Sequence, residues 1–363
     1  MGSPGKIKVA VVFGGRSGEH AISCLSAGSL LRALDPDEFE VLPVGITREG
    51  RWVLGPSDAG QLAVSANGLP EVTEGTGQSV VLAPDPTTRG VQLMEPTDGV
   101  RVLADVDVVF PLLHGAYGED GTIQGLLEMA GLPYVGAGVF ASAAGMDKEF
   151  AKKLVAAEGI PVGPFVVLRA GQSLSVADQE RLGLPVFVKP SRAGSSLGIT
   201  RVDDWSALEA AVAVAREIDP KVLVESAIIG REVECGVLEG EHGGPPESSL
   251  PGEVRIDAQW YDFQAKYRDE VSYDIPAKLP TQVSTRLQEY ATRAFLALDC
   301  AGLARVDFFV TPDFEVYLSE VNTMPGFTPM SAFPQLWAAS GLDYPKLASR
   351  LIRTALARGT GLR

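Results

Sequence analysis

The chain has 363 residues, with 31 lysines and arginines against 46 aspartates and glutamates, so its formal net charge is −15. Such a chain repels polyanions at long range, so neither a nucleic acid nor an anionic membrane surface is expected as a partner. The hydrophobic content of 45% is enough for a sizeable core. The sequence contains no run of about 18 apolar residues, so no membrane span is predicted.

The cysteines and histidines exclude further kinds of site. The cysteines at positions 24, 235 and 300 are far apart and odd in number, which predicts neither a disulfide framework nor a cysteine metal site. The chain has 3 histidines, too few for a histidine-rich metal site. The first residues lack the long apolar stretch and cleavage site of a secretory signal. The sequence therefore predicts a cytoplasmic protein.

The first third of the chain alternates predicted strands and helices. An apolar, β-branched run at 7–13 ends at two glycines, and a helix is expected to begin near His20. A second apolar run at 106–113 ends at a histidine and is followed by another predicted helix. This alternation is typical of a parallel α/β domain. Residues 55–105 are rich in Gly, Pro, Thr and Asp, which predicts surface loops and hairpins.

The remainder mixes short strands with helices, as α+β domains do. Helices are predicted at 146–158, 204–216 and 281–298, and Asp343 is a candidate N-cap for a final helix. The polar segment 239–252 predicts a hairpin tip. Strands are expected at 185–189, 222–225, 232–238, 303–310 and 314–321.

The strongest chemical signal is a predicted hairpin, ARVDFFV followed by YLSEVNTMPG. Arg305 and Asp307 are two residues apart on one strand and therefore share a face, as do Glu320 and Asn322 on the next. The hairpin can bring Asp307 beside Glu320 and Asn322, three oxygen ligands that suit a hard cation such as Mg²⁺. The alternative is a solvated strand face, although unpaired charges are costly in such apolar strands.

Glycine-rich turns give weaker signals, because each also has an ordinary structural explanation. Lys189 precedes a Gly/Ser loop whose N–H groups could approach phosphate, but a plain hairpin loop would look the same. Glu19 follows the turn in VFGGRSGEH, where a helix dipole alone favours a carboxylate. His114 begins HGAYGEDGTIQG and suits either a binding role or a structural one. Lys266 and Tyr267 precede a polar loop that suits either a lid or an exposed loop.

Taken in order, these segments resemble the D-alanine–D-alanine ligase family of the ATP-grasp superfamily. The similarity covers nearly the whole chain, and its ordered motifs are GGRSGEH, HGAYGEDGTIQG, MDK, VKPSRAGSSLG, AKY, RVDFF and EVNTMPG. The resemblance implies an α/β fold with α+β elements, in a three-domain ATP-grasp architecture. The implied parts are an N-terminal parallel α/β substrate-binding domain at 1–137, a central ATP-grasp subdomain at 138–228, and a C-terminal ATP-grasp subdomain at 229–363 with the metal site and a lid loop at 268–276.

The resemblance also implies an activity. The family joins two D-alanines to D-alanyl-D-alanine at the expense of ATP, through a D-alanyl phosphate intermediate, for peptidoglycan precursor synthesis. ADP and phosphate are the other products. ATP is thus the implied co-substrate, with two Mg²⁺ ions that Mn²⁺ can replace. The implied partners are small molecules and a second copy of the chain, as a homodimer.

The site residues that the resemblance implies fall into three groups. Those expected at ATP are Lys148 and Lys189 at the phosphates, Glu225 and Glu232 at the adenine and ribose, and Lys266 at the γ-phosphate. The implied metal ligands are Asp307, Glu320 and Asn322, with Glu320 bridging the two ions.

The third group would contact the amino acids. Glu19 resembles the residue that holds the ammonium group of the first D-alanine, and Ser195 and Tyr267 would complete its hydrogen-bonded network. His114 would lie near the carboxylate of the first D-alanine. Arg305 and the N–H of Gly326 would form the oxyanion site, and Ser331 would bind the carboxylate of the second D-alanine.

Two other interpretations stay open from the sequence. A D-alanine–D-lactate ligase would share these motifs, but Tyr267 favours D-alanine, since depsipeptide-forming relatives carry other residues there, such as Phe. A nucleotide-binding regulatory module without catalysis is a different class of protein. It would be supported by the loss of catalytic or metal-binding residues, but Arg305, Asp307, Glu320 and Asn322 are all present.

Overall fold

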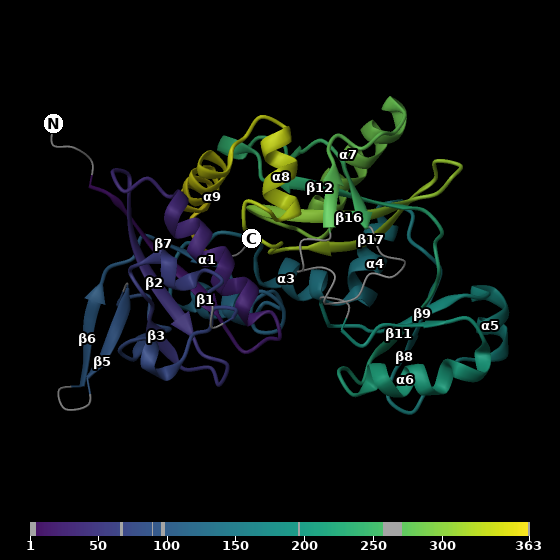
Figure 1. Ribbon diagram of the computed structural model, residues 1–363, viewed down its shortest axis with the longest axis horizontal. Helices are drawn as coiled ribbons and strands as arrows, with labels where there is room; N and C mark the ends of the chain where they lie inside the picture. Colours follow the sequence, from purple (N-terminus) through teal and green to yellow (C-terminus); the bar gives the residue numbers. More distant parts are fainter. Residues whose placement is uncertain are drawn as a thin grey trace.

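The computed structural model describes residues 5–65, 68–88, 90–95, 99–194, 197–256 and 271–361. Figure 1 shows an N-terminal sheet at one end, a small sheet at the other, and a large sheet with helices beside both. Parallel and antiparallel sheets occur together with helices, which confirms the predicted α/β class with α+β elements. Among the described residues, no helix combines the length and apolarity needed to cross a membrane.

The N-terminal sheet is built on an apolar central strand. Its elements are β1 (Ile7–Gly14), β2 (Phe39–Ile46), β3 (Trp52–Leu54) and β7 (Val108–Pro111), in the order β3-β2-β1-β7, with helices α1 (His20–Ala33) and α2 (Thr122–Met129). β1 runs parallel to both β2 and β7, as the alternation of strands and helices predicts. Gly14 and Gly15 have positive φ and turn the chain sharply, so that α1 begins at His20 as predicted.

The segment 55–105 forms hairpins at the outer edge of this sheet, as predicted (Figure 1). Its strands are β4 (Val80–Leu82), β5 (Val91–Glu95) and β6 (Gly99–Ala104), preceded by 3₁₀ turns at Ala59–Leu62 and Glu74–Thr76. None of the predicted site residues lies in this segment.

The small sheet is antiparallel and has helices on one face. Its elements are β8 (Phe165–Leu168), β9 (Val186–Pro190), β10 (Thr200–Val202) and β11 (Val222–Ser226), in the order β10-β9-β11-β8, with α5 (Val176–Leu182), the 3₁₀ turn Trp205–Ala207 and α6 (Leu208–Arg216). Apolar residues at helical spacing on α6 pack against β9 and β11 in a core of their own. The other face of these two strands carries Lys189 and Glu225.

The large sheet carries all three predicted metal ligands. Its strands are β12 (Arg231–Leu238), β13 (Glu247–Ser248), β14 (Gly252–Ile256), β15 (Val271–Asp274), β16 (Leu303–Val310) and β17 (Val316–Asn322), and the main order is β15-β14-β12-β16-β17. The long helix α7 (Thr281–Ala297) packs on its apolar face. The polar tip predicted at 239–252 contains the 3₁₀ turn Glu241–Gly243 and leads through β13 into β14.

The prediction of one helix over 146–158 is wrong about where the helix begins. The structure has two helices, α3 (Val139–Met146) and α4 (Lys148–Ala157), separated by Asp147. Asp147 has extended backbone, and its side chain accepts a hydrogen bond from the N–H of Glu149, as an N-cap does. Both helices share a core with α7 and the large sheet.

The C-terminal helices connect the large sheet with the N-terminal one. They are α8 (Ala332–Ala339) and α9 (Tyr344–Arg358), and the side chain of Asp343 caps α9 as predicted. The buried side chains of α9, among them Leu351 and Ile352, lie in one core with Val9 and Phe110 of the N-terminal sheet. The division into domains at 137 and 228 stays a prediction.

Candidate active site

One face of the large sheet gathers polar residues. Cross-strand partners point to the same side of a sheet, and the register pairs Glu234 with Asp307 and Asp307 with Glu320. The opposite face is apolar and packs on α7. The residues on the polar face are Glu232, Glu234, Arg305, Asp307, Glu320 and Asn322.

A β-bulge in the hairpin aims Glu320 at this face. Phe308 pairs with Leu318 and Asp307 pairs with Glu320, so Ser319 is an extra residue in β17. Without the bulge, Glu320 would point to the same side as Leu318, which is buried in the core. The bulge therefore changes the alternation and places a carboxylate beside Asp307.

Arg305 and Asn322 hold the buried carboxylate of Asp307. Arg305 donates from Nε to Oδ1 at 2.8 Å and from Nη2 to Oδ2 at 2.7 Å, and the amide of Asn322 donates to Oδ2 at 2.9 Å. A second carboxylate, of Glu234, lies 3.5 Å from Arg305 Nε. Although burial opposes the charge, these carboxylates raise the pKa of Arg305 well above its ordinary value. The guanidinium is thus fixed and positive.

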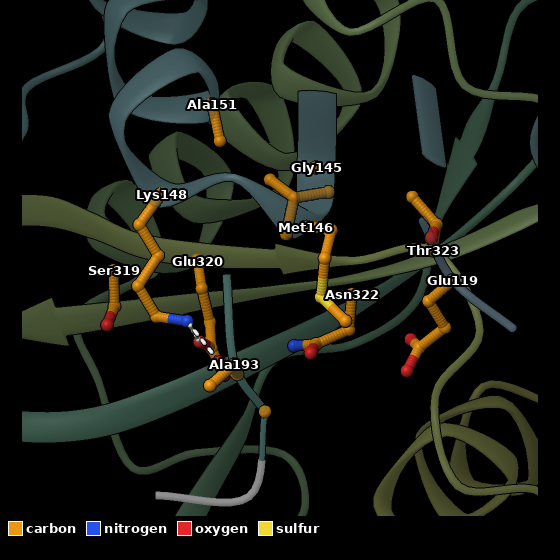
Figure 2. Close-up of a pocket in the computed structure, with 12 residues that line it drawn as sticks. Glu119, Gly145, Met146, Lys148, Ala151, Ala193, Ser319, Glu320, Asn322 and Thr323 are labelled. Carbon is orange, nitrogen blue, oxygen red and sulfur yellow. Dashed lines mark hydrogen bonds and ion pairs between the residues drawn. The ribbon is translucent and has the colours of Figure 1, made fainter. Parts of the chain in front are cut away.

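Lys148 faces this hairpin from the start of α4 (Figure 2). Its Nζ lies 4.0 Å from an oxygen of Glu320 and donates to the backbone oxygen of Ala193 at 2.6 Å. Lys148 therefore links the glycine-rich loop after β9, which contains Ala193, to the carboxylate hairpin of β16 and β17, which carries Asp307 and Glu320. Lys148 and Glu320 line a pocket, and Glu119 and Asn322 line it as well. Burial lowers the pKa of Lys148, and the charge of Glu320 opposes that change.

The oxygen donors of the hairpin fit a divalent cation. Within the described residues, no group of three or more histidines, cysteines, aspartates and glutamates could hold a metal ion. A site here must therefore use Asn322 with Asp307 and Glu320. The Asn322 amide nitrogen bonds Asp307, which leaves its oxygen for another partner, and Asp307 Oδ1 accepts one hydrogen bond and has room for a second contact. An all-oxygen set of this kind suits Mg²⁺.

Glu225 lies between two lysines. It accepts from Lys152 Nζ at 2.5 Å through one oxygen and pairs with Lys189 through the other. Burial alone would raise the pKa of Glu225, but Lys189 and Lys152 outweigh burial and hold the pKa at about 2. The predicted ATP residues Lys189 and Glu225 are thus brought together, while Glu232 lies on β12 of the large sheet.

Glu19 lies where two glycine-rich loops meet. A side chain at Gly115 would come within 2.9 Å of its carboxylate, and one at Gly194 within 3.2 Å. The N–H of Glu19 donates to Ser17 Oγ, which in turn donates to the backbone oxygen of His114. The predicted substrate residues Glu19 and His114 are therefore neighbours, and small residues keep the space beside Glu19 open.

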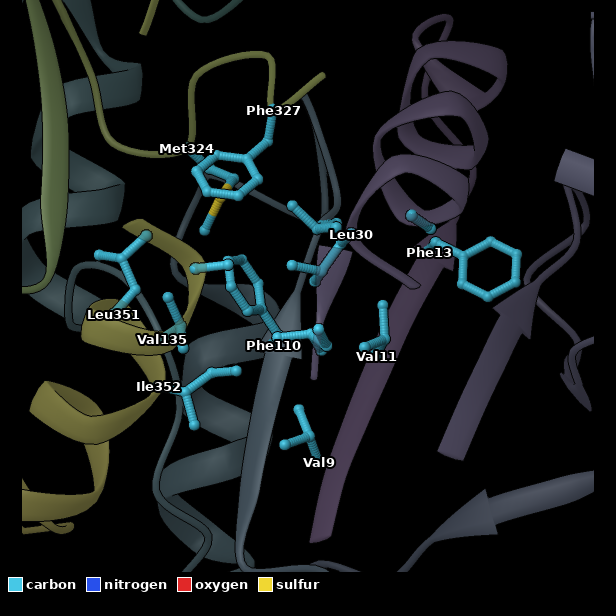
Figure 3. Close-up of a cluster of buried hydrophobic side chains, with 14 of the residues drawn as sticks. Val9, Val11, Phe13, Leu30, Phe110, Val135, Met324, Phe327, Leu351 and Ile352 are labelled. Atoms are coloured by element: carbon cyan, nitrogen blue, oxygen red, sulfur yellow. The ribbon is translucent and has the colours of Figure 1, made fainter. Parts of the chain in front are cut away.

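The loop after β17 is clamped by side chains from the N-terminal part. His114 Nδ1 lies 3.0 Å from the backbone oxygen of Met324, and the N–H of Met324 donates to Glu119 at 3.3 Å. Ser26 accepts the N–H of Phe327 at 3.3 Å. Figure 3 shows Met324 and Phe327 against Phe110 of β7. Gly326 lies between these two anchored residues, so its backbone is held in place from both sides.

The remaining predicted residues are of two kinds. Ser331 precedes α8 next to Gly326, where a side chain would come within 3.1 Å of the Ser331 hydroxyl. The Ser331 hydroxyl also bonds the Thr328 side chain. Ser195, Lys266 and Tyr267, with residues 268–270 of the predicted lid loop, lie outside the described residues.

Lys152 and Glu119 are among the residues of the site that were not predicted from the sequence. Lys152 is one turn beyond Lys148 on α4, so the spacing KEFAK was a signal that both share a helix face. Glu119 stands within the motif HGAYGEDG, but only the structure shows its contacts: the N–H groups of Gly115, at 2.5 Å, and Met324. Burial and the charge of Glu19 raise the pKa of Glu119 to about 8.

We expect the Glu119→Gln variant to change how stability depends on pH. The pKa of Glu119 is higher in the folded protein than the ordinary value of 4.5, so the folded state holds a proton that the unfolded state releases. The wild type should therefore lose stability relative to the variant as pH rises from about 4.5 to about 8. The expected change is a few kcal/mol, at about 1.4 kcal/mol per pKa unit. Urea unfolding from pH 5 to 9 measures it, and a constant difference would contradict the assignment.

Comparisons with known proteins agree with this geometry. Two family models match the chain, "D-ala D-ala ligase N-terminus" over residues 8–137 and "D-ala D-ala ligase C-terminus" over residues 154–353. The D-alanine–D-alanine ligase of Nocardia farcinica is 60% identical over 364 residues, covering 99% of both chains. That of Mycolicibacterium paratuberculosis is 58% identical over 371 residues, covering 100% of both.

Solved structures show the same relationship. The D-alanine–D-alanine ligase from Coxiella burnetii matches with a TM-score of 0.83 and 36% identity, covering 97% of this chain and 94% of that one. The VanG D-Ala:D-Ser ligase from Enterococcus faecalis also has a TM-score of 0.83, with 34% identity, covering 97% and 100%. The predicted ATP-grasp fold is therefore confirmed, and the chain belongs to the D-alanine–D-alanine ligase family.

Proposed function

We propose that the chain joins two D-alanines to D-alanyl-D-alanine with ATP, for peptidoglycan precursor synthesis. The observation that carries the proposal is one juxtaposition: the carboxylate hairpin of Asp307 and Glu320 faces Lys148, beside the glycine-rich loop. Oxygen donors for a cation and ammonium groups for phosphates are both needed where ATP reacts with a carboxylate.

The first step makes the carboxylate of the first D-alanine reactive. A carboxylate is a poor electrophile, so its oxygen takes the γ-phosphoryl group of ATP, giving D-alanyl phosphate and ADP. Two anions must approach each other, and the ammonium groups of Lys148 and Lys189 lower their repulsion. When bound at Asp307, Glu320 and Asn322, two Mg²⁺ ions, or Mn²⁺ in their place, supply further charge neutralisation at the phosphates.

The second step forms the peptide bond. The free amine of the second D-alanine attacks the acyl carbon and gives up a proton, the tetrahedral oxyanion collapses, and phosphate leaves with the C–O bond electrons and takes up that proton. Arg305 and the N–H of Gly326 stabilise that oxyanion. Glu19 holds the first ammonium group, with Ser195 and Tyr267 in its network and His114 near the first carboxylate. Ser331 binds the second carboxylate.

We also propose the compartment and the assembly. The three cysteines are buried and unpaired, in keeping with a reducing cytoplasm. Exposed apolar side chains on α2, α3 and α4, among them Met129, Phe140 and Phe150, would be covered in a homodimer.

Turnover with purified protein tests the activity and its substrate choice. With D-alanine, ATP and Mg²⁺ we expect phosphate release and D-alanyl-D-alanine, and excess EDTA should abolish both. When D-serine or D-lactate competes with D-alanine between pH 6 and 9, the dipeptide of two D-alanines should dominate the products. Preferred incorporation of D-serine or D-lactate would overturn the substrate assignment, and ATP turnover without D-alanine would overturn the ligase assignment.

A further inference from the structure

Lys152 is a buried lysine for which the reaction above has no role. Its side chain is 1% exposed, and its Nζ donates to Glu225 at 2.5 Å. Burial lowers the pKa of Lys152, whereas the charge of Glu225 opposes that change. A buried ammonium is costly unless it is paired, so the chain keeps this group only together with its carboxylate partner.

The Lys152–Glu225 contact joins two separate cores. The neighbours of Lys152 on α4, Ala151 and Val155, are buried with α7 and the large sheet. Glu225 is on β11 of the small sheet, whose core is built from β9, β11 and α6. The ion pair therefore fixes α4, which packs with the large sheet, against β11 of the small sheet.

Glu225 passes this constraint on to Lys189. The second oxygen of Glu225 pairs with Lys189 Nζ, and β9 and β11 are adjacent strands with Leu223 opposite Lys189. Lys148, one helical turn before Lys152 on α4, faces Glu320 of the hairpin. Two lysines expected at the ATP phosphates are thus set relative to each other through Lys152 and Glu225.

We propose that Lys152 is a positioning residue for ATP, which orients Glu225 and Lys189 against α4 without touching the nucleotide itself. This inference rests on the proposed function, because Glu225 and Lys189 are expected at ATP only in that context. Lys148 and Ala151 line the pocket at the hairpin, whereas Lys152 is not among the residues that line it and pairs with Glu225. A residue that acts through Glu225 has no effect of its own once Glu225 has lost its charge.

A double-mutant cycle tests this dependence. Lys152→Met should raise the KM for ATP and the Kd for a non-hydrolysable ATP analogue about tenfold or more, with kcat changed less than about threefold. Glu225→Gln should act in the same direction. In the Glu225→Gln background, the Lys152→Met change should leave KM and Kd almost unaltered, because residues that work as one unit are not additive.

The matched control is Lys153→Met, at the next position on α4. Lys153 is 57% exposed and pairs with Glu149, so its loss should leave KM and Kd unchanged. Lys152→Met removes one of the two lysine partners of the buried Glu225 carboxylate and should lower Tm, whereas the double variant removes both charges of the Lys152–Glu225 pair and should recover part of that loss. If Lys152→Met does not fold, Glu225→Gln and the double variant still provide the decisive comparison.

Three results would overturn the inference. These are an unchanged KM for ATP in Lys152→Met, effects of the two substitutions that multiply, and an equal effect of Lys153→Met. Analogue binding is measured without D-alanine, so it is independent of the ligase reaction. Wild-type protein that binds the analogue but makes no dipeptide would refute the proposed function alone.

Discussion

Arg305→Lys should lower kcat by about 10²–10³ while changing the KM for ATP only modestly. Removing one preorganised donor from an oxyanion site typically has this effect on rate. Lysine keeps the charge but not the planar fork with which Arg305 holds both oxygens of Asp307. The variant therefore loses the direction of the donors while the site keeps its net charge. Steady-state kinetics with ATP and D-alanine varied separately measure the two effects.

A second forked arginine in the same sheet provides the control. Arg231 on β12 forks onto Glu253 on the opposite side of the sheet from Asp307, so Arg231→Lys should leave kcat nearly unchanged. If Arg305→Lys instead destroys ATP affinity and spares kcat, Arg305 is a nucleotide ligand. An equal fall of kcat in Arg305→Lys and Arg231→Lys would mean that the forked contact of Arg305 only stabilises the sheet and has no role at the oxyanion.

The carboxylate hairpin could be predicted from sequence because it depends on short-range order. Arg305 and Asp307 are two residues apart in an apolar strand, and so are Glu320 and Asn322, which fixes their faces once the strands form. The two strands are joined by a tight turn, so their pairing costs little chain entropy. For the same reason the glycine turn before α1 and the Asp343 cap of α9 were placed correctly.

Features that depend on distant contacts could not be predicted. The bulge at Ser319 exists because Leu318 and Glu320 must face opposite sides, and strict alternation along β17 would place them together. The clamp joins Met324 to His114 and Glu119, which both lie more than 200 positions earlier in the chain. The break at Asp147 was also missed, although Asp147 binds Ser191 and Lys221 beside the glycine-rich loop.

Glu320→Gln should lower turnover by about 10²–10³ or more, and excess Mg²⁺ should restore little of it. The substitution keeps the size of the side chain and removes one of the two carboxylates that the cation site requires. Charge stabilisation by a bound cation contributes several kcal/mol to such reactions, and each 1.4 kcal/mol corresponds to tenfold in rate. Lys148 would also lose the charge that faces it at 4.0 Å. Turnover measured against Mg²⁺ concentration separates weaker cation binding from a lower maximal rate.

The same hairpin offers the control for this prediction. Glu315 is an exposed carboxylate in the turn between β16 and β17, and its N–H bonds Thr311, so Glu315→Gln makes the same chemical change without touching the polar face. It should leave both the Mg²⁺ dependence and the maximal rate unchanged. Glu320→Gln should also keep the wild-type Tm without ligands, while the stabilisation that Mg²⁺ and ATP add together should shrink, because that term depends on affinity. Near-normal turnover of Glu320→Gln, or full activity of the wild type in excess EDTA, would remove the cation from this hairpin and leave its two carboxylates with a purely structural role.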